Sequence, residues 1–466
     1  MGFVLSVFYF VVAYLGTTTV FGGLATEIHT EQILAAMVVL VSLPALMKSF
    51  LPKTLQSLAL VGLAIAVLLS VLIGVHWAGG AVQAFFIFIP NAFAYFLVCL
   101  HCNSKRKLQV LVLMLLFVCL FVIAHGTIDL LHIAPSSGPT ETLEPGSVEF
   151  ARWNMAHPYL FAMQNNTGEW LYRLRGLGEI NDPNDFGQLI VCVIPLMFIF
   201  WHRKNKFGNI VFVLLPLSVL LYGLFLTHSR GALLALTAVA VVAARRRIGT
   251  LPSLLLAGGL FVGAMALNFT GGRGISASAG EDRTALWGES LQLLKSHPLF
   301  GVGFGGSPDY LGHTAHNSVA VCLAELGCFG FYFWCLFLFP TLRDSLEIAS
   351  PSKVSEAEPI LPEEGLFPVA TRRIEDIDKA EVNRLGRLLV LSLTGFLVAA
   401  WFLSRAFVMT FFLLGGMAEV VFETALRRGM VASRLPLARI LLYAAIMMVS
   451  LIMFLYILLR IVNLMH

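Results

Sequence analysis

Apolar residues dominate this chain in runs of about 20 residues, separated by shorter polar segments. A run of that length is what an α-helix needs to cross a lipid bilayer. The tight pair of runs around Arg405 could also form one re-entrant element, which would lower the count of spans. The pattern therefore predicts an all-α fold, a polytopic transmembrane helical bundle of about 12–13 spans. The expected spans are 3–22, 31–47, 57–75, 82–100, 108–125, 186–201, 209–227, 231–244, 251–268, 317–340, 388–402, 406–424 and 440–463.

Composition agrees with a membrane protein and excludes an ordinary soluble one. The chain is 58% hydrophobic and 12% charged, with a mean hydropathy of +0.84, whereas soluble domains carry about twice that charge. Residues 3–20 follow no basic segment and precede no cleavage site, so we expect a first span and not a removed signal. The seven cysteines lie in or beside apolar runs, which makes a disulfide framework unexpected.

Basic clusters predict the orientation, because cytoplasmic connections carry an excess of lysine and arginine. Each cluster follows an even-numbered span, so we expect the N-terminus inside and the C-terminus outside. The clusters are Lys48/Lys53, Lys105–Lys107, Arg203/Lys204/Lys206, Arg245–Arg247, Arg384/Arg387 and Arg427/Arg428/Arg434/Arg439.

Two long connections then fall on the outer, periplasmic side, where we expect them to carry short helices. Long ordered loops on a membrane scaffold are a usual place for function. The expected segments are N-terminal spans (1–125), a first periplasmic loop (126–185), central spans (186–268), a second periplasmic loop with an amphipathic helix (269–316), one span (317–340), a cytoplasmic connector (341–387) and C-terminal spans (388–466).

Several arginines break the charge rule on the outer side, including Arg175, Arg230 and Arg283. Arg230 lies in a turn of about four residues between two spans, which places its guanidinium near the lipid interface. Snorkelling to that interface is the simple explanation for one arginine. A group of them suits a phosphate-bearing ligand, because the guanidinium stays charged and offers paired donors to phosphate oxygens. The glycines from Gly301 to Gly306 could add backbone N–H donors, or serve only as a turn.

A histidine pair, His313 and His316, precedes the apolar run that starts at Asn317. Asn317 is a good helix N-cap, and a capped interfacial histidine is the simple interpretation. A neutral imidazole can also accept a proton near neutral pH. Beside a group of arginines it could act as the general base of a transfer from a phosphate leaving group. His316 is the stronger candidate and His313 the weaker.

Two acidic residues are further candidates. Glu325 lies well inside the span after His316, where an acid generally faces a partner or a cavity. It could pair with an arginine, orient His316 or form a purely structural ion pair. Asp185 belongs to a cluster before the sixth span that capping explains well, although an acid there could also position Arg175 or Arg230.

Other chemistries have no matching pattern. The sequence contains no Walker-type loop, no HExxH, no GxSxG and no acidic repeat at metal spacing. We therefore expect no metal, no cofactor and no nucleic-acid partner.

Three segments resemble the O-antigen ligase and polymerase superfamily of bacterial inner-membrane glycan-transfer enzymes. The resemblance is good over roughly residues 170–340 and general elsewhere. Its segments are Arg175-Gly176 with Asn181–Gly187, then Ser229–Ala235, then Arg283, Trp287, His297–Gly303, Ala315–Ser318 and Glu325–Gly327.

This resemblance implies an inverting transfer of a glycan from undecaprenyl pyrophosphate at the periplasmic face, without nucleotide sugar or metal. Carried over, Arg230 and Arg283 would contact the pyrophosphate, and His316 would activate the acceptor hydroxyl of lipid A–core or another acceptor. Arg175, with His313, Asn317, Glu325 and Asp185, would help to bind substrate. The implied location is the inner membrane of a Gram-negative bacterium.

Three alternatives stay open at this point. A polysaccharide polymerase of the same superfamily would use the growing glycan as donor and a repeat unit as acceptor. A protein O-glycosylation ligase would use a serine or threonine acceptor. A transporter of lipid-linked glycans would place its polar groups at mid-membrane on repeated halves. The sequence has no internal repeat, and its polar groups gather on one side, which favours an interfacial enzyme.

Overall fold

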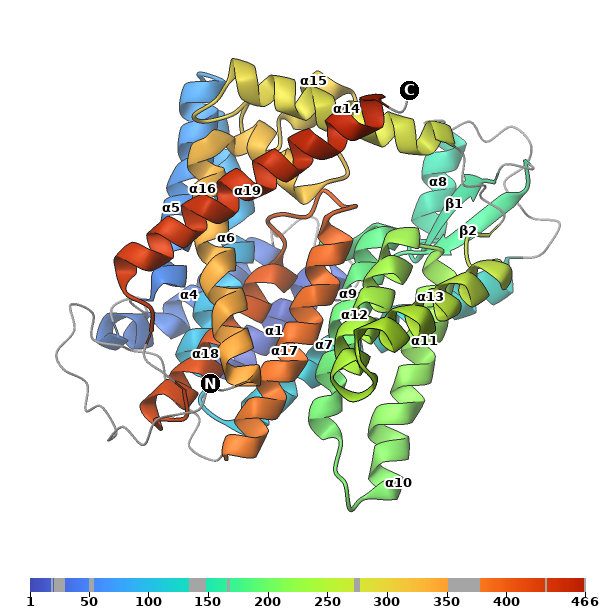
Figure 1. Cartoon of the computed structure of the whole chain (residues 1–466). Coiled ribbons are helices and arrows are strands. Elements are labelled where there is room, and N and C mark those ends of the chain that lie inside the picture. The colour runs from blue at the N-terminus through green and yellow to red at the C-terminus, as the bar shows by residue number, and fades with distance from the viewer. Residues whose placement is uncertain are drawn as a thin grey trace.

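The computed structural model describes residues 1–17, 20, 30–49, 54–133, 148–165, 168–271, 277–350, 378–431 and 434–464. Its elements form a helical bundle (Figure 1). The first are α1 (Gly2–Leu15), α4 (Thr30–Ser49), α5 (Leu55–Leu69), η1 (Ser70–Gly74), α6 (Ala78–His101) and α7 (Lys105–His132). The central ones are α8 (Val148–Ala156), β1 (Leu160–Gln164), β2 (Trp170–Leu174), η2 (Gly178–Ile180), α9 (Pro183–Leu196), η3 (Met197–Phe200), α10 (Lys206–Asn209), η4 (Ile210–Leu214), α11 (Leu215–Thr227), α12 (Arg230–Ile248) and α13 (Thr250–Ala266). The last are α14 (Ala277–Ser296), α15 (Ser307–Leu311), α16 (Ser318–Ala349), α17 (Lys379–Ala400), α18 (Met409–Arg427) and α19 (Leu437–Leu464).

The predicted all-α bundle is confirmed. Within the described residues, nine helices are long and apolar enough to cross a membrane, and three shorter apolar helices accompany them. Each predicted span corresponds to one of these helices or to α12, which carries Arg230 at its start and three arginines in its last turn. The two helices around Arg405, α17 and α18, are separate and both of spanning length.

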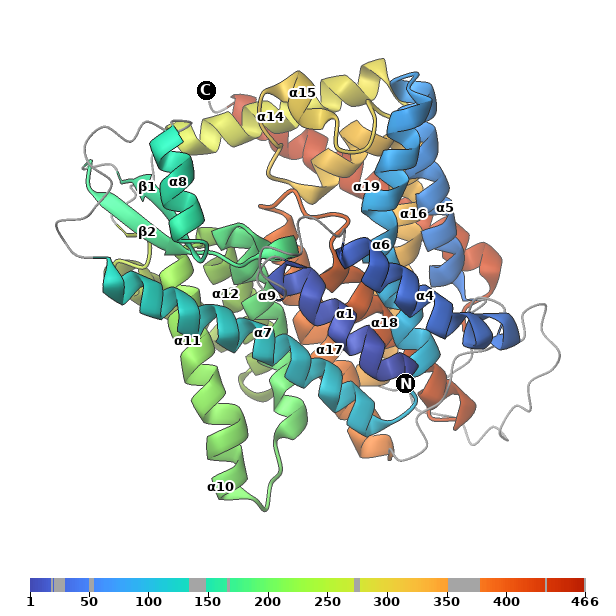
Figure 2. The ribbon, with the colours of Figure 1, turned by 180° about the vertical axis from the view of Figure 1, so that it is seen from behind.

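Burial divides the helices into a centre and a periphery. α18 is almost completely buried, and α16 packs against α5, α14, α17, α18 and α19. α19 is mostly exposed along its length, which is the expected state of a lipid-facing helix. α7 crosses the back of the bundle beside α1 (Figure 2).

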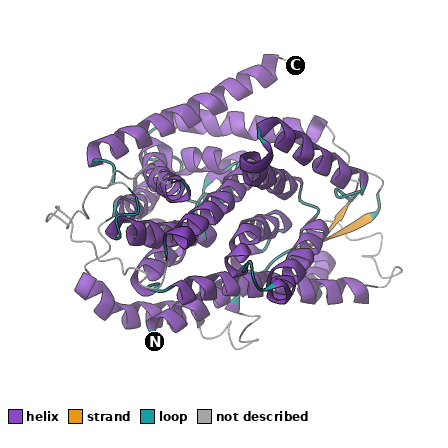
Figure 3. Cartoon of the chain, turned by 60° about the horizontal axis from the view of Figure 1, so that its bottom comes forward, coloured by secondary structure: helices purple, strands orange, loops and turns teal. Residues whose placement is uncertain are grey.

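The first long loop carries a feature that the sequence expectation lacked, a β-hairpin at the edge of the bundle (Figure 3). β1 pairs antiparallel with β2, with Leu160 opposite Leu174. The connection closes with Gly168 at φ +81°, where the backbone N–H of Gly168 donates to the Asn165 carbonyl at 3.1 Å. The loop also carries α8, so short helices are only part of its structure.

α16 is broken at Gly327, whose backbone has φ +62° and ψ −165°. The break frees carbonyl groups that the glycine-rich turn then uses: Val302 N donates to Ala324 O at 2.8 Å, and Gly303 N donates to Glu325 O at 3.1 Å. A Cβ on Gly327 would lie 2.4 Å from Leu299 O. Glycine is therefore required for the turn and the broken helix to pack together.

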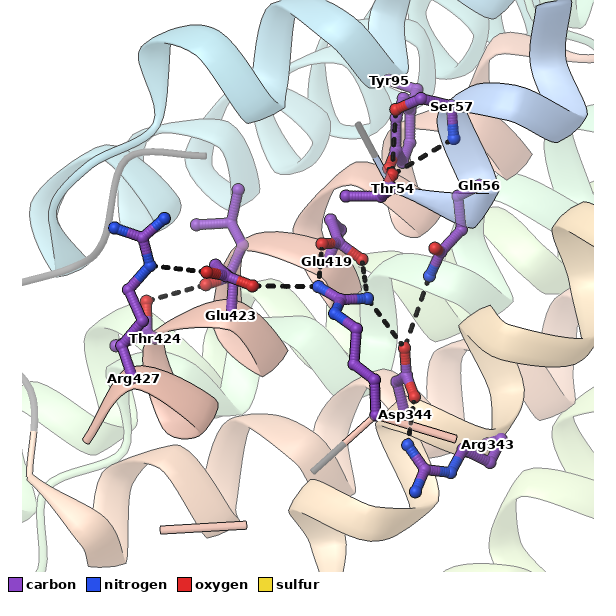
Figure 4. Close-up of polar contacts among 12 residues, drawn as sticks. Thr54, Gln56, Ser57, Tyr95, Arg343, Asp344, Glu419, Glu423, Thr424 and Arg427 are labelled. Carbon is purple, nitrogen blue, oxygen red and sulfur yellow. Dashed lines mark hydrogen bonds and ion pairs between the residues drawn. The ribbon is translucent and has the colours of Figure 1, made fainter. Parts of the chain in front are cut away.

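The helices of the second long loop and one of the basic clusters lie at opposite ends of the bundle. α10, next to a basic cluster, lies at the bottom of Figure 1, whereas α14 and α15 lie at the top. A buried ion network occupies the α18 end near the basic residues, where Arg434 pairs with Glu419, Glu423 and Asp344 (Figure 4).

Candidate active site

Arg230 is the first residue of α12 and is held by a constrained turn. His228 adopts a left-handed conformation with φ +48°, and its Nδ1 lies 2.7 Å from Phe269 O. Ser229 caps α12 by accepting the Ala232 N–H at 3.3 Å. On the other side, Arg173 Nε donates to Thr227 O at 2.9 Å. These bonds fix the backbone position from which the half-buried side chain of Arg230 extends.

Arg283 of α14 lies within electrostatic range of Arg230. Four residues further along this helix, buried Trp287 donates its Nε1–H to Ala315 O at 2.8 Å. This bond ties α14 to the segment that precedes α16. Burial lowers the pKa of the Arg283 guanidinium, and the like charge of Arg230 lowers it further. Two positive groups from separate loops therefore lie close together.

His316 lies beside them, at the end of the segment tied down by Trp287. It adopts φ +50°, and its backbone N–H donates to Ser404 Oγ at 2.9 Å. Burial lowers the pKa of the His316 imidazole, the charge of Arg283 lowers it further, and Asp182 acts in the opposite direction. The imidazole is thereby kept neutral, which is the state that can accept a proton.

The capping residue Asn317 connects this arrangement to α16. Its Oδ1 accepts the N–H groups of Val319 at 2.9 Å and Ala320 at 3.0 Å. The cap orients the first turn of α16 and leaves His316 just outside the helix. His313, three residues earlier, is exposed and also acts electrostatically on His316.

Arg175 lies in the segment after β2, and its guanidinium donates hydrogen bonds to carbonyl groups of the same loop. Its Nε donates to Pro158 O at 2.9 Å, and its NH2 group donates to Asn154 O at 3.4 Å. Burial lowers the pKa of Arg175, and Asp182 opposes that shift. Arg175 thus lies near the same acid as His316, and its role toward substrate stays a prediction.

Asp185 is paired with an arginine that the sequence interpretation did not connect to it. Its buried carboxylate forms an ion pair with Arg405, from the loop between α17 and α18. Sequence reasoning had considered Arg175 or Arg230 as its partner. Residues 220 positions apart along the chain leave no local pattern that could have revealed this pair.

Glu325 faces the glycine-rich turn. Its carboxylate accepts the Ser307 hydroxyl at 2.8 Å and hydrogen-bonds the main chain at Gly305 and Ser307. These partners are a hydroxyl and main-chain groups, so neither an arginine nor His316 is among the hydrogen-bond partners of Glu325 in the described part of the chain.

The hydrogen bonds of the Gly301–Gly306 backbone correct the suggestion that this turn donates N–H groups to a phosphate. Its N–H groups already have partners within the protein: Gly301 N bonds His297 O, Phe304 N bonds Ser70 Oγ, and Gly306 N bonds Gly303 O. With Val302 and Gly303 bonded to α16, the donors of this turn serve packing.

Comparison with known proteins bears on the central part of the chain. Residues 215–335 match the family model described as O-antigen ligase. The matched region contains Arg230, Arg283 and His316, whereas Arg175, Asp185 and Arg405 lie outside it. No curated protein matches the chain.

Proposed function

We propose that the chain is a membrane glycosyltransferase of the ligase type, on the basis of the match of residues 215–335 to the O-antigen ligase family model. It would move a glycan from undecaprenyl pyrophosphate to a hydroxyl of lipid A–core. The transfer would invert the anomeric centre and use no metal. It would take place at the periplasmic face of the inner membrane of a Gram-negative bacterium.

The observation that carries this proposal is the pairing of two arginines beside one neutral histidine. Arg283 is partly buried, and within the described residues its guanidinium makes no hydrogen bond or ion pair to the protein. A second guanidinium, that of Arg230, lies within electrostatic range. Like charges placed together at a lipid interface are stabilised by an anionic ligand, and paired donors suit pyrophosphate oxygens.

The proposed step uses each group once. The acceptor oxygen attacks C1 of the glycan from the face opposite the pyrophosphate, while His316 takes the hydroxyl proton. The C1–O bond to phosphate breaks, and its electron pair leaves with undecaprenyl pyrophosphate. Arg230 and Arg283 stabilise the negative charge that develops on the leaving group. His316 then returns its proton to solvent.

Reconstitution tests the proposal directly. Purified protein in lipid nanodiscs is given undecaprenyl-pyrophosphate-linked glycan and lipid A–core, with a chelator and without nucleotide. We expect lipid A–core carrying the glycan, detected by mass spectrometry, with the anomeric configuration inverted by NMR. Absence of any glycosylated product would contradict the proposal.

Variants assign the roles. His316→Ala should abolish transfer while the protein remains folded and inserted, because no base then takes the proton. Arg230→Lys should lower the rate about 10- to 100-fold, the loss of one charged hydrogen bond of about 1.5–3 kcal/mol, since a point charge cannot replace the fork. His132→Ala is the matched control, because His132 is exposed and its one hydrogen bond among the described residues is to the Ile128 carbonyl of its own helix.

The same assay separates the rival functions. Lengthening of the donor glycan without lipid A–core would identify a polymerase. Transfer to serine or threonine of a peptide would identify a protein O-glycosylation ligase. Movement of the lipid-linked glycan between leaflets without any new glycosidic bond would identify a transporter.

A further inference from the structure

The loop between α17 and α18, residues 401–408, contacts His316 although it lies far from it in sequence. We propose that this loop is the element that positions the His316 imidazole, and that Arg405 is a positioning residue that holds the loop in place. The inference rests on the proposed role of His316 as the base. It adds residues outside the matched region 215–335.

Hydrogen bonds join the two segments on both sides of His316. Ser404 Oγ accepts the backbone N–H of His316 at 2.9 Å. Ser318 Oγ accepts the backbone N–H of Arg405 at 2.9 Å and donates to Leu403 O at 2.6 Å. The 316–318 segment and the 403–405 segment are therefore held in one register.

His316 needs such support because of its own backbone. A φ of +50° is unfavourable for a residue with a Cβ and persists only where the surroundings impose it. Trp287 fixes the carbonyl of Ala315 at 2.8 Å, and Ser404 fixes the N–H of His316. The peptide before His316 is thus held at both ends, which sets the direction in which its side chain leaves the backbone.

The loop is in turn attached to the bundle at two points. The Arg405 guanidinium pairs with the buried Asp185 carboxylate near the start of α9. Trp334 of α16 donates its Nε1–H to Ala406 O at 3.0 Å. The ion pair is the only attachment to α9 among the hydrogen bonds of the described loop residues, so its loss frees that side of the loop.

Arg405 differs from the two arginines proposed to bind pyrophosphate. Asp185 neutralises its charge, and Glu179 and Asp182 lie within electrostatic range. A guanidinium surrounded by acids is a weak site for another anion. Its chemistry therefore indicates a structural clamp acting through His316.

A small cavity borders the ion pair of Arg405 with Asp185. Its lining includes Tyr14, Glu179, Asp185, Gln188, Arg405 and Thr410. The Tyr14 hydroxyl and Thr410 Oγ1 lie 2.8 Å apart in this lining. A lysine at position 405 keeps the positive charge that faces Asp185 but loses the guanidinium fork, so Arg405→Lys should retain part of the function.

The test compares Arg405→Gln, Arg405→Lys and Ser404→Ala in the reconstituted transfer assay. We expect Arg405→Gln to lower kcat about 10- to 100-fold, as for a small misplacement of a catalytic group. KM for the lipid-linked donor should stay within about two-fold, because Arg230 and Arg283 are untouched. Arg405→Lys should recover part of kcat, and Ser404→Ala should lower kcat in the same way.

Arg427→Gln is the matched control. Arg427 pairs with buried Glu423, and its side chain is 35% exposed, as is that of Arg405. Loss of a buried ion pair should lower the melting temperature of both Gln variants. The kcat of Arg427→Gln should nevertheless stay at the wild-type value. Hydrogen–deuterium exchange of residues 313–318 should accelerate in Arg405→Gln and remain unchanged in Arg427→Gln.

The outcomes separate the two proposals. If wild type transfers, His316→Ala does not, and both Ser404→Ala and Arg405→Gln keep wild-type kcat, the positioning role is overturned alone. Unchanged exchange of residues 313–318 in Arg405→Gln also overturns it, without reference to activity. If Arg405→Gln fails to fold, the kcat of Ser404→Ala alone tests the positioning role, and a wild-type value overturns it. Lack of transfer by wild type, or full activity of His316→Ala, refutes the proposed function.

Discussion

The arginines around the site differ in their partners within the protein. Arg173 is buried and bonds Thr227 O and Asn184 Oδ1, so it braces the turn that carries Arg230. Arg405 is neutralised by Asp185. Arg283 has no hydrogen-bonded or ionic partner among the described residues and is partly buried. An uncompensated guanidinium of this kind is costly unless an anion completes it.

The charge of Arg283 should be visible in the pH dependence of transfer. A base must be neutral, so the rate falls as pH drops through the pKa of His316, which burial and Arg283 place below its ordinary value. Arg283→Gln removes a positive neighbour and raises that pKa. We expect the acidic limb of the rate profile to move to higher pH.

Arg283→Lys provides the control for this prediction, because lysine keeps the charge but loses the fork. Its rate should be lower throughout, with the acidic limb where wild type has it. Rate profiles from pH 5 to 9 in nanodiscs measure the difference. A limb that does not move in Arg283→Gln would show that His316 does not titrate under the influence of Arg283.

At the scale of elements, apolar run length was enough to predict the spans, because burial in lipid requires it. The same uniform hydrophobicity concealed the break in α16, since Gly327 lies inside a continuous apolar run. The strands Leu160–Gln164 and Trp170–Leu174 flank the sequence Asn-Asn-Thr-Gly. Such a run of turn-favouring residues between two short strands is the signal from which the hairpin could be predicted.

Gly327 should be intolerant of any side chain. Gly327→Ala places a Cβ 2.4 Å from Leu299 O in a backbone region that costs other residues about 1–3 kcal/mol. We expect a clear fall in melting temperature. Gly258→Ala, in α13, meets nothing within 4 Å and should leave stability unchanged or raise it by up to about 1 kcal/mol. Equal melting temperatures for the two variants would contradict this interpretation of the break.

Over the whole molecule, two polar layers lie near opposite ends of the helices. One is the site around His316, and the other is the ion network of Arg434 (Figure 4). Aromatic side chains fill the interior between α16 and α18, including Phe337, Phe411 and Phe412, which are fully buried. Arg230 and His316 could be proposed from sequence because each stands directly before the apolar part of a predicted span, and Arg283 because it lies in the predicted loop that leads to His316. Pairings such as Asp185 with Arg405 depend on how the helices assemble and required the structure.

The Arg434 network should govern stability without governing transfer. Arg434→Leu leaves Glu419 buried without its arginine partner and removes one of the two arginines that pair with Glu423, a change that typically costs about 3–5 kcal/mol. We expect a large fall in melting temperature, with the surviving folded protein keeping the wild-type KM. A variant as stable as wild type would mean that the network is dispensable.

The positive-inside rule predicts on which side of the membrane the site lies, and accessibility from each side tests that prediction. Asp309 in α15 and His202 beside a basic cluster are both exposed. Six of the seven native cysteines are buried and only Cys328 is partly exposed, so Cys328→Ser gives a background with little labelling. In that background, Asp309→Cys should react with a membrane-impermeant maleimide applied to the periplasmic side, and His202→Cys only in inverted vesicles. Because the arginines and His316 lie at the α14 end of the bundle, the reverse pattern would place the proposed transfer in the cytoplasm.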